Sequence, residues 1–525
     1  MKLDVSITPS SVSMIHTMTA AASGGGGSPY GDDLAFEVSA VPSSTMRIRL
    51  YHNSSVTPDF EVDWGNGEVH TFDDVYSTSS GYLEFRNNSA IDANTVVRVK
   101  SPNKRCDRFL PIHADFVTAC KQLGDIGYIS LASMFYNCRN MITFEAGICD
   151  TSSVTNMSSM FYRCYDITTI DSSGMNTSSV TNMSSVFRDC RSLTSLDISG
   201  FDTSSVTNMS NMFYSVESLT SLDVSGFDTS SVTNMNTVFY KCQSLTSLDV
   251  SGFDTSSVTN MSSMFRLCAG LTSIDVSGFD TSSVTSMFGM FKSCTGLTTL
   301  DVSSLNTSSV TQMSSLFQDC SSLTSLDVSG FDTSSATNMS YMFQNCRSIT
   351  GTLDLTTFDT SSVTDMRSMF STLAGDNSTS LTLNVTGWNT SSVTTMENMF
   401  FGFSGISILG LGGWDTSSLT NVYQMFYDTD RLTSIIDIDT WDITNVTSEY
   451  NFAFRTTGIN TAKYDQILVA WEADVSAVVG YSNGGSWRFY NPNSPIRYTT
   501  GSAAETARTN LINNHGWTIT DEGGT

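Results

Sequence analysis

Hydrophobic and polar positions recur with a period of 26 residues along most of this chain. In the stretch LTSLDIS (193–199), leucine and isoleucine alternate with serine and aspartate, which is the period of two typical of a half-buried strand. After a corner at Gly200, apolar residues recur at i, i+3, i+7 and i+10, the spacing of a helical stripe (Val206, Met209, Phe213 and Val216). Each unit therefore predicts a strand, a corner, a short helical turn and a return.

The threonine of a TSSV-like motif marks the units. It occurs at eight positions 26 residues apart and continues after steps of 27, 30 and 26 residues, at Thr151, Thr177, Thr203, Thr229, Thr255, Thr281, Thr307, Thr333, Thr360, Thr390 and Thr416. A single unit cannot bury its own apolar stripe, so stability must come from stacking against neighbouring units. We therefore expect about twelve stacked coils between residues 125 and 450.

The segments on either side of the repeats have other patterns. Residues 1–33 form an arm that ends in a Gly-rich linker, and residues 34–105 alternate in short runs, as in a small β-sandwich. Residues 106–124 are expected to cap the first coil. Residues 451–525 are expected to cap the last coil with two amphipathic helices, TAKYDQILVAWEA and SAAETARTNLINN, the first of which buries Ile467, Leu468 and Trp471.

The repeat MFxxCxSLTSLDVSGFDTSSVTNM resembles that of BspA-like leucine-rich-repeat surface proteins, in the variant also found in mycoplasma lipoproteins. FEVDWGNGEVHTF (60–72) is similar to the PKD-type sandwich that often precedes such repeats, and the C-terminal segment is similar to that of members in phages and marine bacteria. The resemblance implies an α/β repeat fold: a leucine-rich-repeat-like solenoid with a parallel β-sheet on one face and short helical turns on the other, behind a small β-sandwich. It also implies surface display and adhesion without catalysis in the repeats.

Charge and hydropathy narrow the classes of partner. The net charge is −26, which argues against nucleic acid as a partner. No apolar run approaches the ~18 residues of a membrane span, so membrane insertion is not expected. The opening MKLDVSITPSSVSMIHTMTA has an early aspartate and lacks the apolar core of an export signal.

Cysteine recurs at one position of the unit. Eight of the eleven cysteines occupy it, namely Cys138, Cys164, Cys190, Cys242, Cys268, Cys294, Cys320 and Cys346. Adjacent coils ~4.8 Å apart would permit disulfides between neighbours. Val216 interrupts the series, however, so pairing of neighbours cannot be complete, and a valine there indicates a site for a small apolar group. The sequence therefore predicts a structural column of buried thiols rather than disulfides or a metal site.

Aspartate recurs at two positions of the unit. The aspartate at the corner (Asp202 and its equivalents) is replaced by Asn176, Asn306 and Asn389, which fits a turn or capping acceptor better than a calcium site. The strand aspartates should point outward between rows of hydroxyls. Solvent can simply screen this row, or the row can bind glycan hydroxyls, a divalent cation or another receptor group; the candidate receptor-binding residues are Asp197, Asp223, Asp249, Asp275, Asp301 and Asp327.

No nucleophile, base or metal constellation stands out, because the five histidines lie singly in the flanking segments. We therefore expect no enzyme, no catalytic residues, no metal and no cofactor. The leading hypothesis is a virion structural protein of a bacteriophage, a fibre, decoration or receptor-binding component on the virion surface. Its arm would bind other virion proteins, its coils would bind a host surface glycan or protein, and a homo-oligomer is compatible with this arrangement.

The alternative hypothesis is a bacterial cell-surface or extracellular adhesin that binds glycan or protein. A third hypothesis is ice or mineral binding by the regular hydroxyl rows, which the charged aspartate in each row disfavours.

Overall fold

The computed structural model of the chain describes residues 30, 33–51, 60–71, 77–79, 82–101, 108–112, 114–373, 381–403, 407–429, 438–446, 452–456, 459–478, 486–490 and 496–524. Most of the predicted arm and linker (1–33) and the insertion near residues 375–380 lie outside these described residues. Within them the protein is mostly β, with parallel strands in several sheets and two α-helices, both near the C-terminus. The predicted α/β class is therefore wrong in one respect: the described coils do not contain the α-helical turns that were expected on one face.

An N-terminal β-sandwich comes first. One sheet has the order β5-β6-β2-β8, from strands β2 (Arg47–Tyr51), β5 (Ser77–Ser79), β6 (Tyr82–Arg86) and β8 (Arg108–Ile112). The facing layer contains β1 (Leu34–Val38), β3 (Glu61–Asp63), β4 (Val69–His70), β7 (Thr95–Lys100) and β9 (Val117–Gln122). The rings of Phe36 and Phe109 meet between the layers, 5.5 Å apart. Because β8 pairs with β2, the sandwich extends past residue 105 into the segment expected to be a cap.

The sandwich and the first coils share one sheet. Strand β9 pairs antiparallel with β1 on one side and parallel with β10 (Thr143–Glu145) on the other. Strand β11 (Thr169–Asp171) then continues the parallel pairing, which completes a seven-stranded sheet. The backbone ladder therefore passes from the sandwich into the coils without interruption, and the exposed edge of the first coil is paired.

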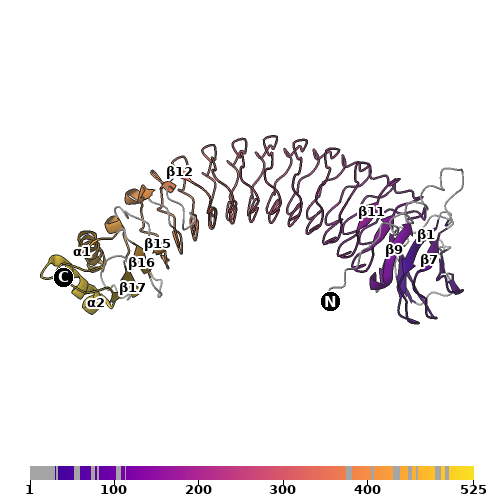
Figure 1. Cartoon of the computed structure of the whole chain (residues 1–525), viewed down its shortest axis with the longest axis horizontal. Coiled ribbons are helices and arrows are strands. Elements are labelled where there is room, and N and C mark those ends of the chain that lie inside the picture. Colours follow the sequence, from indigo (N-terminus) through magenta and orange to yellow (C-terminus); the bar gives the residue numbers. More distant parts are fainter. Residues whose placement is uncertain are drawn as a thin grey trace, which may run out of the picture.

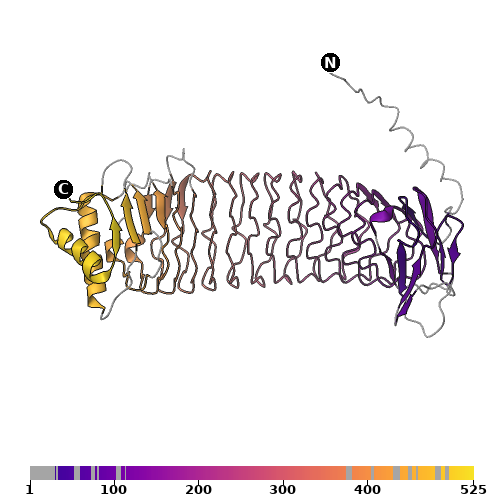
Figure 2. The ribbon, with the colours of Figure 1, turned by 90° about the horizontal axis from the view of Figure 1, so that it is seen from below.

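The coils stack in a single arched row (Figures 1 and 2). Parallel bridges join the same position of successive coils, from Ser130 through Asn156 and its equivalents to Asn421. Strand geometry is regular toward the C-terminal end, in β12 (Gly351–Asp354), β13 (Leu381–Asn384) and β14 (Ser407–Leu409). A last parallel sheet contains β15 (Phe426–Thr429), β16 (Phe452–Thr456), β17 (Ser486–Tyr490) and β18 (Thr518–Thr520).

The segment predicted as a helical turn is a run of β-turns. In residues 157–163 the N–H groups of alternate residues donate to carbonyls of the next coil at 2.8–3.0 Å. Between them, the N–H groups of Met160 and Tyr162 donate to the carbonyl three residues earlier, and Ser159 and Arg163 are left-handed, with φ of 58° and 63°. A helix would need every N–H for its own i−4 carbonyl, so pairing between coils excludes it. We call this segment, with its equivalents in the other coils, the turn ladder.

The turn ladder lies on the inner side of the arch. Equivalent rings approach more closely there, with 4.3 Å between the centroids of Tyr214 and Tyr240, than at the corner, where Phe331 and Phe358 are 6.5 Å apart. Between the strand segments of the central coils, backbone bonds are fewer and longer, at 3.2–3.3 Å. In Figure 1, β15, β16 and β17, which continue the turn ladder, lie on the inner side of the arch. The strand segments therefore form the outer face.

Phenylalanine and methionine fill the interior of the row. Each coil contributes one phenylalanine of the turn ladder, and its ring stacks on the equivalent ring of the next coil, with centroids 5.2–6.0 Å apart from Phe135 to Phe426. These rings are buried, and each contributes about 1.5–3 kcal/mol by leaving water. The core is therefore continuous along the row, and each coil depends on its neighbours.

Two helices follow the last described coils, as predicted. Helix α1 (Thr461–Ala477) begins at the cap Asn460, and α2 (Ala503–His515) begins at Ser502. Ile467, Leu468 and Trp471 are buried, as expected. The Trp471 indole donates to the carbonyl of Ile438, in the 3-10 turn η4 (Ile438–Thr440), at 3.3 Å. The helix therefore packs against the end of the row. In the described part of the chain, no helix is long and apolar enough to cross a membrane.

Candidate functional site

The repeat cysteines line the interior of the turn ladder. All eight are buried free thiols in the structure. From Cys164 onward each Sγ lies 2.9–3.3 Å from the carbonyl oxygen of the phenylalanine 29 residues earlier. Burial raises the pKa of Cys268 and of Cys320 to about 12. A thiol held protonated and out of solvent is a poor nucleophile and a poor metal ligand, so this column is structural.

A column of buried threonines holds the corners together. The eleven TSSV-type threonines, from Thr151 to Thr416, are at most 2% exposed. Each hydroxyl donates to the carbonyl of the corner Asp or Asn in the next coil at 2.8–2.9 Å. In the first two of these contacts the hydroxyl also accepts the N–H of the same residue, as Thr177 does from Asp202 at 2.8 Å. The threonine thus bridges two coils rather than capping its own turn.

The corner aspartates act as turn acceptors, as predicted. The Oδ1 atom of Asp202 accepts the backbone N–H of Ser204 at 3.0 Å and its hydroxyl at 2.6 Å. These bonds lower the pKa of Asp202. An asparagine keeps the same bond, since Asn176 accepts the N–H of Ser178 at 3.0 Å. The corner therefore needs an oxygen acceptor rather than a charge.

The strand aspartates have a similar internal role that the sequence did not suggest. All six candidates, from Asp197 to Asp327, are exposed on the outer face. The Oδ1 atom of Asp223 accepts the N–H of Ser225 at 2.9 Å and its hydroxyl at 2.6 Å, and the other five accept at least the same N–H. These serine bonds lower the pKa of Asp223. The carboxylates stay ionised, and one oxygen of each is engaged within the chain.

The strand aspartates also line a furrow on the outer face. It has a volume of about 740 Å³ and contains Asp275, Asp301 and Asp327 among serine and threonine hydroxyls (Ser273, Ser277, Thr299, Ser303 and Ser325). The furrow follows from the wider spacing of coils on this side. Its chemistry is uniform: acceptor oxygens and hydroxyls at the pitch of the coils. Within the described residues, no group of three or more His, Cys, Asp or Glu side chains is placed to hold a metal ion.

The inner face carries different chemistry, which the sequence analysis missed. The residue after each ladder phenylalanine varies between coils and is half-buried in all of them except the first, where Tyr136 is exposed: Tyr136, Tyr162, Arg188, Tyr214, Tyr240, Arg266, Lys292, Gln318 and Gln344. The guanidinium of Arg188 lies 5.2 Å from the ring of Tyr162 and 4.2 Å from that of Tyr214. Arg266 lies 5.6 Å from the ring of Tyr240. A row of aromatic and cationic side chains therefore follows the inner face.

A network of ion pairs lies beside the first part of this row. Arg191 lies 3.1 Å from the buried Asp189, and Lys241 lies 2.9 Å from Glu217. Arg191 is also within 3.6 Å of Glu217, so the pairs form a network across three coils.

Within the row itself, Arg188 lies 4.0 Å from Asp189 and donates to Oδ1 of Asn211 at 3.0 Å. The next two cations of the row differ, because Arg266 and Lys292 make no ion pair within the described part of the chain. Burial and the neighbouring Arg266 lower the pKa of Lys292.

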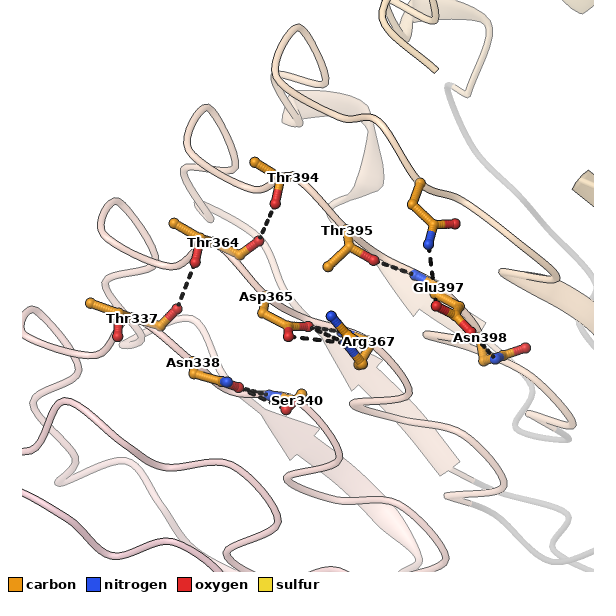
Figure 3. A network of polar contacts seen from close by, with 11 residues as sticks. Thr337, Asn338, Ser340, Thr364, Asp365, Arg367, Thr394, Thr395, Glu397 and Asn398 are labelled. Carbon is orange, nitrogen blue, oxygen red and sulfur yellow. Dashed lines mark hydrogen bonds and ion pairs between the residues drawn. The ribbon is translucent and has the colours of Figure 1, made fainter. Parts of the chain in front are cut away.

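A groove of about 610 Å³ opens on the inner face beside Lys292. It is lined by Phe288, Lys292, Ser314, Ser315, Gln318, Asn338, Ser340, Tyr341, Asp365 and Arg367. Figure 3 shows one end of it, where Arg367 is held by Asp365 at 3.0 Å and Ser340 by Asn338 at 2.7 Å. A sequence signal existed: the ten lysines and arginines of residues 125–450 all fall between the NM-type motif and the SL of the next strand.

Comparison with known proteins identifies a family that contains these repeats. A family described as "Mycoplasma protein of unknown function, DUF285" matches residues 129–222, 216–300, 272–383 and 374–481. No curated protein and no solved structure matches the chain significantly. The four matches run without a gap from residue 129 to residue 481, which is more than half of the 525 residues. The chain therefore belongs to the DUF285 family of Mycoplasma-type repeat proteins.

Proposed function

We propose that this chain is a non-enzymatic attachment protein, a structural component of a bacteriophage virion that acts as a fibre, decoration or receptor-binding component at the virion surface. Its coils form a leucine-rich-repeat-like solenoid of the BspA type, which holds a surface glycan or protein along its length. Its N-terminal arm joins other virion proteins.

One observation carries the proposal: polar chemistry repeats at fixed pitch on an exposed face of a continuous core. The outer face offers the row from Asp197 to Asp327, at one aspartate per coil, among hydroxyls. An extended partner with its own repeat meets such a row with many equal contacts, and their sum gives avidity without any strong single contact.

The test uses the full-length chain and two changes that keep the fold. The first is the triple variant Asp223→Asn, Asp249→Asn and Asp275→Asn. Asparagine preserves the turn, because Asn384 occupies the equivalent position and accepts the N–H of Thr386 at 3.2 Å. The second removes two whole units, residues 192–243, and rejoins equivalent positions of the repeat.

Both changes should weaken adsorption of purified protein to host cells. Three contacts of roughly 0.5 kcal/mol each correspond to about tenfold in affinity for the triple variant. The shortened chain should lose affinity in step with the number of coils. If both variants melt as wild type does and adsorb equally well, the coils are not the attachment surface.

The alternative is a bacterial cell-surface adhesin, and membership of a family described from Mycoplasma supports it. Antibodies against the chain distinguish the two hypotheses. They label purified particles and sediment with them if the protein belongs to a virion. They label intact cells in the absence of phage if it is a cellular adhesin.

A further inference from the structure

We infer that the inner-face groove beside Phe288 binds an acidic oligosaccharide, whose carboxylate lies between Arg266 and Lys292 and whose sugar ring lies against Phe288. This inference rests on the proposed attachment function, and it names the ligand class and the place where the ligand binds. The groove lies on the opposite side of the row from the strand aspartates.

Phe288 is out of keeping with its position in the repeat. Its side chain is 38% exposed, whereas the equivalent positions in the adjacent coils are Ser262 and Ser314. Its backbone is fixed, because the Phe288 carbonyl accepts the N–H of Ser263 at 2.7 Å. An exposed ring on a hydrogen-bonded backbone, among hydroxyls and amides, is suited to stacking against the apolar face of a sugar ring.

The two cations lack the partners that their neighbours have. The equivalent Arg188 lies 4.0 Å from Asp189 and donates to Asn211, whereas Arg266 and Lys292, in adjacent coils, have no ion pair among the described residues. The Nε atom of Arg266, like those of Arg163 and Arg188, is buried without a hydrogen-bond acceptor among the described residues. Two like charges at close range repel each other, and a carboxylate placed between them would relieve that repulsion and supply the missing acceptor.

The remaining lining residues favour a ligand rich in hydroxyls. Gln318 presents a buried Oε1 atom without a donor among the described residues, and Asn338, Ser340 and Tyr341 add donors and acceptors. The one carboxylate of the lining, Asp365, is neutralised by Arg367 at 3.0 Å. The ligand must therefore supply hydrogen-bond donors as well as a negative charge. A single sugar-acid unit supplies both, because it carries hydroxyl groups and a carboxylate.

A peptide is a poorer fit because the backbone of the groove is already paired. Ser263 donates to the carbonyl of Phe288, and Gly289 donates to the carbonyl of Ser314 at 3.0 Å. Addition of a strand needs an unpaired edge, which the turn ladder does not offer here. The net charge of −26 disfavours long polyanions such as nucleic acid.

The repeat itself supplies variants that should fold. Phe288→Ser, Lys292→Gln and Arg266→Gln each install the residue that another coil carries at that position, as in Ser314 and Gln318. Lys292 lines the groove, and Arg266 is its equivalent in the preceding coil. Arg347→Ser is the control, because it removes one positive charge outside the groove lining and two coils away from Lys292, and it installs the equivalent of Ser321.

The experiment is isothermal titration of the full-length chain with short acidic saccharides, namely oligogalacturonate, oligomannuronate, a hyaluronan tetrasaccharide and sialyl oligosaccharides, beside neutral maltoheptaose and poly-glutamate. We expect at least one acidic saccharide to bind, more weakly as salt rises, and maltoheptaose and poly-glutamate not to bind. Lys292→Gln with Arg266→Gln and, separately, Phe288→Ser should each weaken binding about tenfold or more, and Arg347→Ser should leave it unchanged.

Three outcomes overturn the inference: no acidic saccharide binds, binding survives the groove variants, or poly-glutamate binds with the same loss in the charge variants but none in Phe288→Ser. The first two leave the proposed function standing if the intact chain still adsorbs to cells. Loss of adsorption in the outer-face variants alone would assign attachment to the strand aspartates instead.

Discussion

The threonine column gives the sharpest test of how the coils hold together. Thr255 is 1% exposed, and its hydroxyl donates to the carbonyl of Asp280 in the next coil at 2.8 Å. Valine has nearly the same shape but no donor, so Thr255→Val leaves a buried acceptor without a partner. We expect this change to lower the free energy of unfolding by about 1–3 kcal/mol.

Serine separates the hydrogen bond from packing. Thr255→Ser keeps the hydroxyl and removes one methyl group, which costs about 0.8 kcal/mol by the transfer of a CH₂-sized group. Changing Thr229, Thr255 and Thr281 together enlarges the difference. The valine triple variant should lose about 3–9 kcal/mol and the serine triple about 2–3 kcal/mol, with departures from additivity because the sites lie in adjacent coils.

Urea denaturation followed by circular dichroism measures the difference. A repeat array can unfold in parts, so hydrogen exchange of the Met261 amide, which donates to the carbonyl of Ser286 in the next coil at 3.1 Å, accompanies the global measurement and reports local opening. A valine triple as stable as the serine triple would refute the reasoning, because it would mean that the hydroxyls add nothing beyond their volume.

Two further predictions concern pH. Burial raises the pKa of seven repeat thiols above the ordinary value of 9.0, so the unfolded chain loses these protons first. The contribution of these thiols to the free energy of unfolding should be fully present below about pH 9 and fall above it by about 1.4 kcal/mol per pH unit for each thiol. The double variant Cys242→Val, Cys268→Val, which copies the valine found at Val216, should make this fall less steep. Serine bonds lower the pKa of Asp223 and Asp249, so the stability that they add is present above about pH 4 and lost on further acidification; acid melting of the triple asparagine variant should show a smaller loss.

The sequence was sufficient to predict the stacking of coils, because near-identical units with an apolar stripe have few other ways to bury it. It was misleading for the turn ladder. The spacing of Val206, Met209, Phe213 and Val216 fits a helix, but it also fits successive β-turns, each of which returns a side chain to the interior after three or four residues. Residues that favour left-handed backbone would have distinguished β-turns from a helix. The left-handed positions, however, are occupied by Thr237 and Leu267 as well as by Asn211, which tolerates this conformation better.

The candidate site was only partly accessible to sequence reasoning. The constant residues of the unit drew attention, and the structure places the strand aspartates on an exposed face, where each also holds its own turn. The serine two residues later was visible in the motif DVS, but its bond depends on a turn that follows the strand. The inner face was missed because its residues differ from coil to coil and because only the arch brings Phe288, Lys292 and Gln318 to one groove.

The two faces of the row therefore suit different tasks. On the outer face an aspartate occupies the same position in coil after coil, so every coil presents the same groups to a partner. A partner can therefore shift along the row by one coil with little loss of binding free energy. On the inner face, tyrosine, arginine, lysine and glutamine follow one another at a single position, and a phenylalanine replaces serine in one coil alone between 256 and 330. Such differences define one place on an otherwise uniform row. A repetitive outer face can supply avidity, but recognition of one ligand in one register requires the variable inner face.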